Sequence, residues 1–276
     1  ICLTPIGNLS DMPQRALDAL ASADVVCAED TRVTGKLLAA FGIGKRLERL
    51  DEALIGSRAD GIVARVEAGE VIAYCSDAGM PGVSDPGLRL VRAAREAGAP
   101  VEVLPGASAC ATAYVASGCT CPRFYFGGFF PRKDVERKAA LDALRTLDAA
   151  LIFYESPNRV ASALESMAQA FPLREAAVCR ELTKLHEEVV RAPLPDLRDE
   201  FARRAQEGSI KGEIAIVIDE PSAAEEDAAQ LDAAEAARVR AAELKAEGAR
   251  NKEIAKAIAA EFGLSRNAAY EIALDA

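Results

Sequence analysis

The sequence has 276 residues, half of them hydrophobic, and a formal net charge of −10 at pH 7. A chain of this length can bury a sizeable core, and its acidic balance argues against a protein that coats nucleic acid nonspecifically. No apolar run approaches the roughly 20 residues of a membrane span, and seven scattered cysteines do not form a secreted disulfide framework. We expect a cytoplasmic protein without a signal peptide, with a few residues of a first strand upstream of Ile1.

The first part of the sequence alternates short apolar runs with helical patterns. We predict strands over Val25–Ala28, Val71–Tyr74 and Val101–Val103. The predicted helices are Met12–Ala21, Thr31–Phe41, Arg58–Ala68, Gly87–Ala97 and, approximately, Ser108–Ala116. Ser10 or Asp11 is the expected cap of the first helix, with Pro13 in its first turn. This alternation is typical of a mostly parallel sheet and indicates an α/β domain over residues 1–117.

A second α/β domain is predicted over residues 122–220, after a linker at Ser117–Pro122. Its predicted strands are Phe124–Phe126, Leu151–Tyr154, Ala177–Cys179, Glu188–Ala192 and Ile214–Ile218. The predicted helices between them are Lys138–Leu147, Asn158–Ala170 and Leu197–Gln206. This mixture indicates a sheet with some antiparallel pairing.

The composition changes at Glu220–Asp227, an acidic, alanine-rich run that we interpret as a flexible connection. A small helical domain over residues 229–276 follows, with helices Leu231–Glu247, Asn251–Phe262 and Ser265–Leu274. A tight turn at Gly263 joins the last two helices into a helix-turn-helix-like unit. Its acidic lead-in argues against DNA readout, and such helix pairs often serve only packing.

Three loops rich in glycine and proline are the candidate ligand site: Thr4–Asp11, Cys75–Gly87 and Leu104–Ala109. Ligands of open α/β sheets lie at the carboxyl ends of the strands, where glycine lets the backbone approach them. The loops carry no Walker A or G-x-G-x-x-G sequence, and their charged groups are carboxylates such as Asp77 and Asp85. These features suit a ligand with a ribose, an adenine edge and a positive charge, such as S-adenosylmethionine. Any one loop alone could be an ordinary β–α turn.

The remaining reactive and charged residues give weaker signals. Four cysteines lie within apolar runs and are expected in the core: Cys27, Cys75, Cys110 and Cys179. Cys119 and Cys121 lack a second pair or a clustered histidine, so we expect no metal site, and we expect His186 at the surface. Two basic clusters are either local nucleic-acid patches or, as charge alone favours, solvated helix faces: Arg123, Arg132–Lys133 and Arg137–Lys138; Arg174, Arg180 and Lys184.

A set of segments in fixed order resembles a known family. The segments are Thr4–Leu9, Ala28–Arg32 with Thr34–Gly35, Ser76–Pro81 with Ser84–Gly87, Leu104–Gly106, Phe153–Pro157 with Arg159, Cys179–Lys184 and Lys211–Glu213. This set resembles the tetrapyrrole-methylase superfamily, and within it the ribosomal RNA small-subunit methyltransferase I branch, which 2′-O-methylates a cytidine ribose in 16S rRNA. The last helices, with Asn267–Tyr270, resemble the small C-terminal domain of that branch, and we expect them to contact RNA or the ribosomal surface.

The resemblance implies an α/β fold of two tetrapyrrole-methylase-like domains plus a small C-terminal helical domain, usually as a homodimer. It implies S-adenosylmethionine in the cleft between the α/β domains and 16S rRNA of the 30S subunit as substrate. The cofactor-binding residues that it implies are Ser76, Asp77, Ala78, Gly79, Pro81, Gly106, Ala107, Ser108, Ala109, Tyr154, Glu155, Gly212 and Glu213.

The same resemblance implies that the Thr4–Asn8 loop and the Glu29–Arg32 segment face the acceptor. A ribose hydroxyl is a poor nucleophile, so a positioned base should assist it. The candidates are Glu29, Asp30, Asp77, Glu155, Glu181 and Lys184. We favour Glu29 or Asp30, with Arg32 binding a phosphate, and an internal salt bridge from Glu29 to Arg32 is the equal alternative. The expected RNA-binding residues are Asn8, Arg32, Arg180 and Lys184.

The sequence departs from the family in one place that bears on the acceptor. Where the family often has a His-Asn-Glu stretch, this chain has Leu50–Gly56, so we do not carry over an acceptor contact through that histidine. Two other functions stay open at this stage: methylation of a corrin or porphyrin precursor, and a non-catalytic RNA-binding assembly factor.

Overall fold

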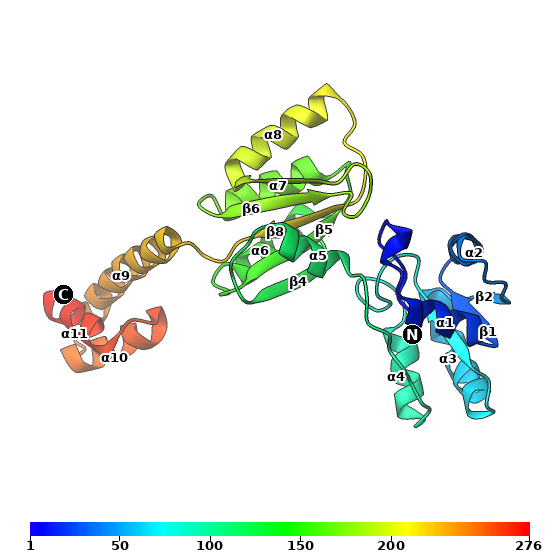
Figure 1. Cartoon of the computed structure of the whole chain (residues 1–276). Helices are drawn as coiled ribbons and strands as arrows, with labels where there is room; N and C mark the ends of the chain where they lie inside the picture. Colours follow the sequence, from blue (N-terminus) through cyan, green and yellow to red (C-terminus); the bar gives the residue numbers. More distant parts are fainter. The chain divides into compact units, whose positions relative to one another are not determined.

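The computed structural model describes the backbone of residues 1–276 and all side chains except those of residues 226 and 228–230. The chain forms two compact units, Ile1–Glu220 and Pro221–Ala276. The larger unit contains two sheets, drawn in blue to cyan and in green to yellow in Figure 1. In the part of the chain described, no helix has both the length and the apolarity needed to cross a bilayer.

The first sheet is parallel and has the strand order β2-β1-β3. Its strands are β1 (Val25–Ala28), β2 (Leu47–Arg49) and β3 (Ile72–Cys75). The helices of this half are α1 (Gln14–Ser22), α2 (Thr31–Ala40), α3 (Glu52–Glu67) and α4 (Leu88–Glu96). Val26 and Cys27 of the central strand enter two different core clusters, so β1 is buried on both faces. This burial explains its uninterrupted apolar sequence.

Several predictions for the first half were wrong in detail. Val101–Val103 is not a strand, because it pairs irregularly with the chain start: the Ile1 amino group donates to the Glu102 carbonyl at 2.8 Å. The first helix is not capped by Ser10 or Asp11, because both lie in the 3-10 turn η1 (Leu9–Asp11); Pro13 occupies the cap position, outside the first turn. The third helix begins at Glu52 instead of Arg58, because the Asp51 carboxylate caps it by accepting from Leu54 N at 2.9 Å.

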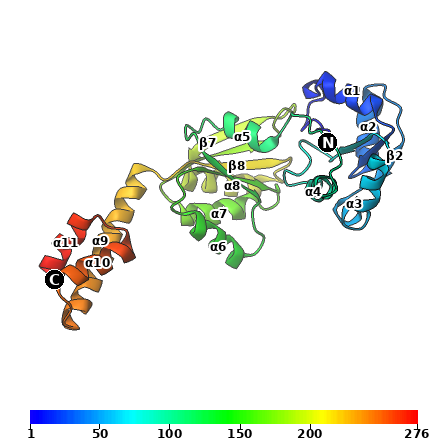
Figure 2. The same cartoon turned by 90° about the horizontal axis from the view of Figure 1, so that it is seen from below.

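The second sheet is mixed and has the order β4-β5-β8-β6-β7, which confirms the predicted antiparallel pairing. Its strands are β4 (Phe124–Phe129), β5 (Ala150–Glu155), β6 (Glu175–Arg180), β7 (Glu188–Pro193) and β8 (Ile214–Ile218). One face is covered by α5 (Ala109–Ala116). The other is covered by α6 (Asp134–Leu144), α7 (Val160–Ala170) and α8 (Leu194–Glu207). Figure 2 shows α5 on one side of the sheet and α6 and α7 on the other.

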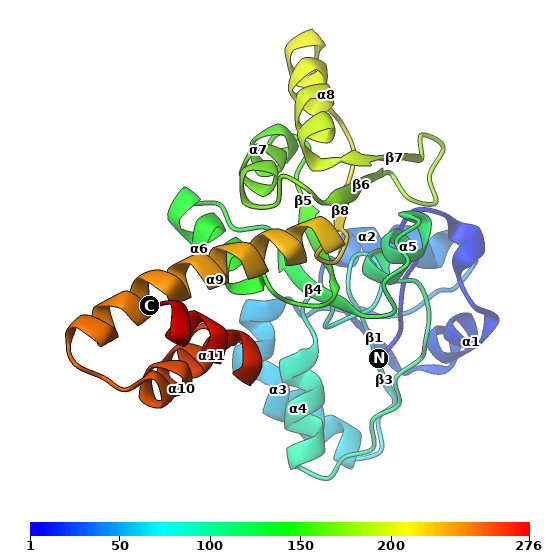
Figure 3. The ribbon, with the colours of Figure 1, turned by 90° about the vertical axis from the view of Figure 1, so that its left-hand side faces the viewer.

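The smaller unit consists of α9 (Ala223–Ala246), α10 (Asn251–Phe262) and α11 (Arg266–Asp275), which pack against one another (Figure 3). The helix-turn-helix-like turn is present at Gly263, which has a left-handed φ of +66°. The prediction of a flexible connection over Glu220–Asp227 was wrong for its second part, since α9 begins inside it. The Ser222 hydroxyl caps this helix by accepting from Glu225 N at 3.2 Å.

The four cysteines expected in the core are buried and His186 is exposed, as predicted. The two basic clusters were predicted to be either nucleic-acid patches or solvated helix faces. Neither prediction holds for Arg137 of the first cluster or Arg174 of the second, because both are buried. The Arg137 guanidinium donates to the Pro131 carbonyl at 2.9 Å. That of Arg174 stacks 4.1 Å from the Phe171 ring centroid. These two arginines therefore support the fold instead of forming a patch for nucleic acid.

Candidate active site

A cavity of about 450 Å³ lies where the two sheets of the larger unit meet. Its walls come from the ends of β1, β3, β5 and β6, from the start of β8, and from the loop before α5. The lining residues are Ile6, Glu29, Asp77, Ala78, Gly79, Met80, Val83, Ser84, Asp85, Ser108, Ala109, Phe129, Tyr154, Glu155, Ser156, Pro157, Cys179, Leu182, Gly212, Glu213, Ile214 and Ala215. We call this cavity the cleft.

The pairing of β1 with β3 brings the first two acidic residues of the cleft together. Ala28 lies opposite Cys75, so both strands end at one edge of the sheet. Beyond that edge Asp77 N donates to Glu29 Oε2 at 3.2 Å, and Asp30 N donates to Asp77 Oδ1 at 3.1 Å. The two loop ends therefore hold each other through their own carboxylates.

Gly79 joins the second loop to the first. Thr4 and Gly79 exchange two backbone hydrogen bonds of 2.9 and 3.0 Å. Gly79 has a φ of +74°, and a Cβ at this position would lie 3.2 Å from Ile6 Cγ2, so glycine suits both the backbone and the space. This exchange fixes the Thr4–Asp11 loop against the floor of the cleft.

The opposite wall is formed by a strained turn after β6. Glu181 and Thr183 have positive φ values of 52° and 66° although neither is glycine. The Glu181 carboxylate accepts from Glu213 N at 2.9 Å and from Lys184 Nζ at 3.0 Å, and Lys184 Nζ also donates to Glu213 Oε2 at 2.9 Å. A Cβ on Gly7 would lie 2.5 Å from Lys184 Cγ, so the first loop packs directly on this turn.

The cleft is electrostatically negative. Burial and, after it, the carboxylates of Glu29, Asp77 and Glu213 together raise the pKa of Asp85 to about 7. Burial likewise raises the pKa of Glu29, against the hydrogen bond from Asp77 N. Lys184 is the cation that borders these carboxylates most closely. Burial lowers its pKa, but hydrogen bonds to Glu213 and Glu181 outweigh this and keep it charged.

Most residues expected to bind the cofactor line the cleft. These are Asp77, Ala78, Gly79, Ser108, Ala109, Tyr154, Glu155, Gly212 and Glu213. Ser76, Pro81, Gly106 and Ala107 do not line it. Ser76 is buried and accepts from the Thr4 hydroxyl through its carbonyl at 3.3 Å. A Cβ on Gly106 would lie 2.2 Å from Leu3 Cδ2. These two positions therefore act in packing beneath the loops.

Of the three residues favoured for the acceptor reaction, Glu29, Asp30 and Arg32, only Glu29 lines the cleft; the candidate bases Asp77 and Glu155 line it as well. Asp30 caps α2 by accepting from Arg32 N at 2.8 Å, and hydrogen bonds from Arg32 hold its pKa well below its usual value. The Arg32 side chain is 85% exposed and pairs with Asp30. The alternative prediction of a salt bridge from Glu29 to Arg32 was therefore wrong in its partner. Asn8 is exposed and caps η1 through its side chain.

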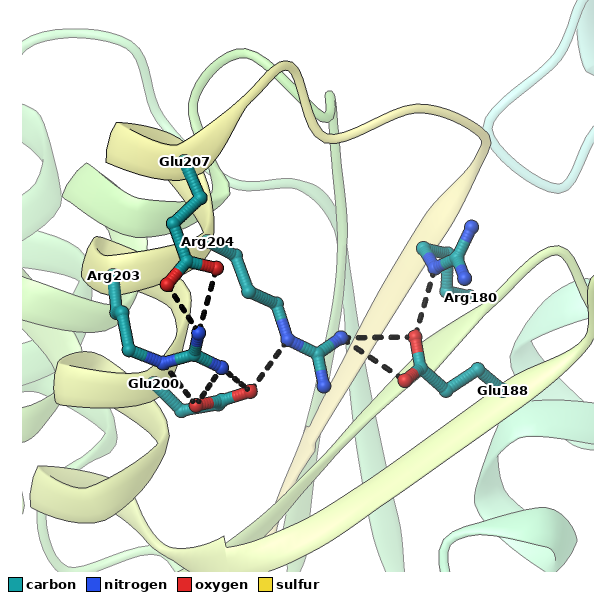
Figure 4. A network of polar contacts seen from close by, with 6 residues as sticks. All are labelled: Arg180, Glu188, Glu200, Arg203, Arg204 and Glu207. Atoms are coloured by element: carbon teal, nitrogen blue, oxygen red, sulfur yellow. Dashed lines mark hydrogen bonds and ion pairs between the residues drawn. The ribbon is translucent and has the colours of Figure 1, made fainter.

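Arg180 belongs to a network of ion pairs on the second sheet (Figure 4). Its Nε donates to Glu188 at 3.0 Å, and Glu188 also accepts from Arg204 at 3.0 Å. The network continues to Glu200, Arg203 and Glu207. Since Lys184 is held by two carboxylates, both expected RNA-binding residues of this segment already have partners within the protein.

Sequence reasoning missed the walls that β6 and β8 contribute, chiefly Leu182, Ile214 and Ala215. It placed Asp85 in a candidate loop but gave no reason to prefer it as a base. The one signal in the sequence that draws attention to Asp85 is the turn-like run Ser84-Asp85-Pro86-Gly87. In the structure Ser84 and Gly87 of this run both have positive φ.

Two further features lie outside the cleft. An open hollow of about 590 Å³ is lined by Arg46, Glu48, Arg49, Leu54, Arg58, Arg65 and Glu70, and Glu48 pairs there with three arginines. Within the residues described, Cys119, Asp219 and Glu220 form the single group with metal-ligand chemistry. Burial raises the pKa of Cys119 to about 12, which disfavours its thiolate, and Asp219 already pairs with Arg191.

Comparison with known proteins agrees with this fold and cleft. Residues 4–198 match the family model for Tetrapyrrole (Corrin/Porphyrin) Methylases. The chain is 41% identical over 274 residues to Ribosomal RNA small subunit methyltransferase I of Escherichia coli O157:H7, covering 99% of this chain and 93% of that protein. It is 38% identical over 269 residues to the protein of the same name in Halalkalibacterium halodurans, covering 98% and 92%.

Solved structures show the same fold at lower identity. A diphthine synthase matches with a TM-score of 0.60 and 16% identity, covering 78% of this chain and 87% of that one. Uroporphyrin-III-C-methyltransferase from Thermus thermophilus matches with a TM-score of 0.52 and 22% identity, covering 78% and 90%. The chain therefore belongs to the tetrapyrrole methylase family, whose members use S-adenosylmethionine. Within that family it belongs to the ribosomal RNA small subunit methyltransferase I branch.

The cleft fits this cofactor in size and charge. Its volume of about 450 Å³ is in the range of small-molecule sites. Ala78, Gly79 and Gly212 leave the backbone accessible, and the carboxylates suit a positively charged ligand that carries a ribose diol. Glu155 Oε2 is buried without a hydrogen-bond partner among the described residues, so one acceptor remains for a ligand donor.

Proposed function

We propose that this protein transfers a methyl group from S-adenosylmethionine to the 2′-hydroxyl of a cytidine ribose in 16S rRNA of the small ribosomal subunit. The observation that carries this proposal is the similarity to small-subunit ribosomal RNA methyltransferases over 98–99% of the chain, C-terminal helices included. A partial match would have covered only the α/β unit, which the family shares with methylases of other acceptors.

The residues proposed to hold the cofactor are those that line the cleft from both sheets. On one side Asp77, Ala78 and Gly79 offer a carboxylate and backbone groups, and on the other Tyr154, Glu155 and Gly212–Glu213 do the same. When bound, the cofactor supplies an electrophilic methyl group on a positively charged sulfur. Ile6, Phe129 and Leu182 are the apolar walls that exclude water from the reacting groups. Holding two reactants in such a site can contribute about 7–11 kcal/mol to the reaction.

The acceptor RNA is proposed to approach from the end of β1. Glu29 lies there in the cleft, and the exposed Arg32 guanidinium is positioned to bind a phosphate. Arg49, at the end of β2, pairs in register with Ala28 and adds a second exposed cation to this edge. Contact with RNA is also proposed for Asn8, Arg180 and Lys184. Arg180 and Lys184 would then leave their present carboxylate partners and bind phosphate oxygens instead.

We further propose that the protein is a cytoplasmic homodimer and that its helical unit contacts RNA or the ribosomal surface. Exposed apolar side chains gather at the edge strand β4 and on neighbouring α5, where the Tyr114 and Phe124 rings lie 4.9 Å apart. The exposed members are Val115, Phe124, Tyr125 and Phe129. An apolar edge of this kind supports association with a second copy. Light scattering on the purified chain tests the stoichiometry.

Two measurements test the function. Calorimetric titration with S-adenosylmethionine should show saturable binding, and absence of binding would leave only a non-catalytic assembly role. Incubation with methyl-labelled cofactor and either 30S subunits or a precursor corrin should place the label in a nuclease-resistant dinucleotide of the RNA. Label confined to the corrin would refute the proposed acceptor.

A further inference from the structure

The carboxylates in and around the cleft differ in whether a protein donor holds them. Glu29 accepts from Asp77 N and Asp77 accepts from Asp30 N. Glu155 is held by Ser156 N and Arg159, and Glu213 by Lys184. The Asp85 carboxylate has no hydrogen bond or ion pair to any residue that the structure describes. Among the cleft carboxylates of the described residues, it is the one with neither oxygen held by a protein donor.

The loop that carries Asp85 is fixed by its own backbone and by the second sheet. Gly82 N donates to the Pro86 carbonyl at 3.1 Å, which closes the loop around Asp85. Ser84 has a positive φ of 62°, a conformation that persists in a non-glycine residue only where the surroundings hold it. Its hydroxyl lies 3.2 Å from where a Cβ on Gly128 would be, so the loop reaches the bulge of β4. Asp85 thus lines the cleft with Phe129 and Tyr154 of the second sheet.

The charged groups that shift the pKa of Asp85 are all carboxylates. Glu29 and Asp77 act on it from the first sheet and Glu213 from the second, and the charge of Asp85 in turn raises the pKa of Tyr74 and Tyr154. The cation Lys184 pairs with Glu213 and Glu181 and not with Asp85. Burial, then these three carboxylates, raises the pKa of Asp85 to about 7. A base with a pKa close to the working pH is ionised often enough to act and basic enough to take a proton.

We propose that Asp85 is the catalytic residue that accepts the proton of the ribose 2′-hydroxyl, an assignment that rests on the proposed methyl transfer. The ribose oxygen bonds to the methyl carbon while the carbon–sulfur bond opens with its electron pair on sulfur, and an Asp85 oxygen takes the hydroxyl proton. Asp85 is partly exposed, so it returns that proton to solvent afterwards. Glu29 then acts as a positioning residue, which holds the Asp77 loop and adds to the negative field.

The test compares the wild-type chain with Asp85→Asn, which keeps the shape of the side chain. Asp60→Asn, at an exposed position of α3, is the matched control. Methylation of 30S subunits is measured from pH 5.5 to 9, and cofactor affinity by calorimetry. We expect Asp85→Asn to lower kcat by about 10²–10⁴-fold and to change the cofactor Kd by less than about 3-fold. The wild-type rate should rise with pH through about 7, and the variant should lose this limb.

A second readout does not need turnover. Carboxyl ¹³C NMR of aspartate-labelled, cofactor-free protein should show one resonance that titrates near pH 7 and is missing in Asp85→Asn. The assignment is overturned if the variant keeps kcat within about 3-fold of an active wild type. It is also overturned if cofactor affinity falls by the same factor as kcat, since Asp85 would then bind the cation of the cofactor. A wild-type chain that methylates no RNA would instead refute the proposed function.

Discussion

Asp77 N donates to Glu29 Oε2 at 3.2 Å, and this contact joins the ends of β1 and β3 at the floor of the cleft. The two residues come from segments 48 positions apart, and the parallel pairing of Val25–Ala28 with Ile72–Cys75 brings them together. Glu29 therefore has a structural role, as the acceptor for Asp77 N, and an electrostatic role through its negative charge.

Replacing Glu29 by Gln removes the negative charge but keeps an acceptor for Asp77 N. Of the carboxylates that add to burial in raising the pKa of Asp85, Glu29 has the largest effect. With that charge gone, the pKa of Asp85 falls, so a larger fraction is ionised at pH 6. We expect the rising limb of the pH–rate profile to move to lower pH, with the folding stability little changed. If the rising limb does not move, the charge of Glu29 does not influence the pKa of Asp85, which would contradict this prediction.

Replacing Gly106 by Ala tests the packing beneath the third loop. The added Cβ would lie 2.2 and 2.3 Å from the two Leu3 methyl carbons, and Leu3 is fully buried. We expect the free energy of unfolding to fall by about 1–3 kcal/mol, as for other overpacked cores. Gly61→Ala is the control, because nothing lies within 4 Å of its Cβ on α3. That change should stabilise the chain by about 0.5–1 kcal/mol, and equal effects of the two would contradict the packing described.

The structure confirms best those predicted elements in which the apolar residues of the segment itself indicate which side chains are buried. Ile214–Ile218 is buried at every position and is a strand with the predicted bounds, and Asn251–Phe262 is likewise a helix with the predicted bounds. Leu47–Arg49 escaped prediction because two of its three residues are charged. Their partners lie elsewhere in the chain: Glu48 pairs with Arg65 of α3. Local pattern cannot reveal a strand that is stabilised by distant ion pairs.

The candidate site divides in the same way. Glu29 and Asp77 lie in loops that motif and strand end both indicate, so the sequence was sufficient to propose them. Ala215 lines the cleft because Arg180 pairs with Ile214 and Cys179 with Ala215 in antiparallel register. The hydrogen bonds of Lys184 to Glu181 and Glu213 depend on the same register. Such neighbours follow from sheet order, which an uninterrupted apolar strand does not specify.

Replacing Arg32 by Ala tests the proposed RNA approach. The side chain is 85% exposed and its ion pair with Asp30 is at the surface, so the free energy of unfolding should change little. We expect weaker binding of 30S subunits and a salt dependence of log K smaller by about 1, with cofactor affinity unchanged. Arg92→Ala, 79% exposed on α4, is the control and should leave RNA binding as it is. Equal loss in both variants would point to a nonspecific charge effect.

Replacing Glu188 by Gln tests the ion-pair network of Figure 4. Burial raises the pKa of Glu188, but hydrogen bonds from Arg180 and Arg204 outweigh it, so the folded pKa lies below the usual value. The network therefore stabilises the fold at neutral pH, and this contribution is lost as the pH falls through the folded pKa. We expect urea unfolding to show a loss of about 1 kcal/mol at pH 7 that shrinks in acid. Glu207→Gln, with its side chain 61% exposed, should cost less than about 0.5 kcal/mol. A loss independent of pH would contradict the ionic origin.

The central claim is that the acidic cleft directs a methyl group onto a ribose oxygen of small-subunit RNA. The most direct measurement is mass analysis of nucleosides from 30S subunits that lack the modification, after incubation with the protein and S-adenosylmethionine. We predict that the amount of 2′-O-methylcytidine rises toward one residue per subunit. A methyl group on a base, or unchanged nucleosides while the cofactor binds, would contradict it.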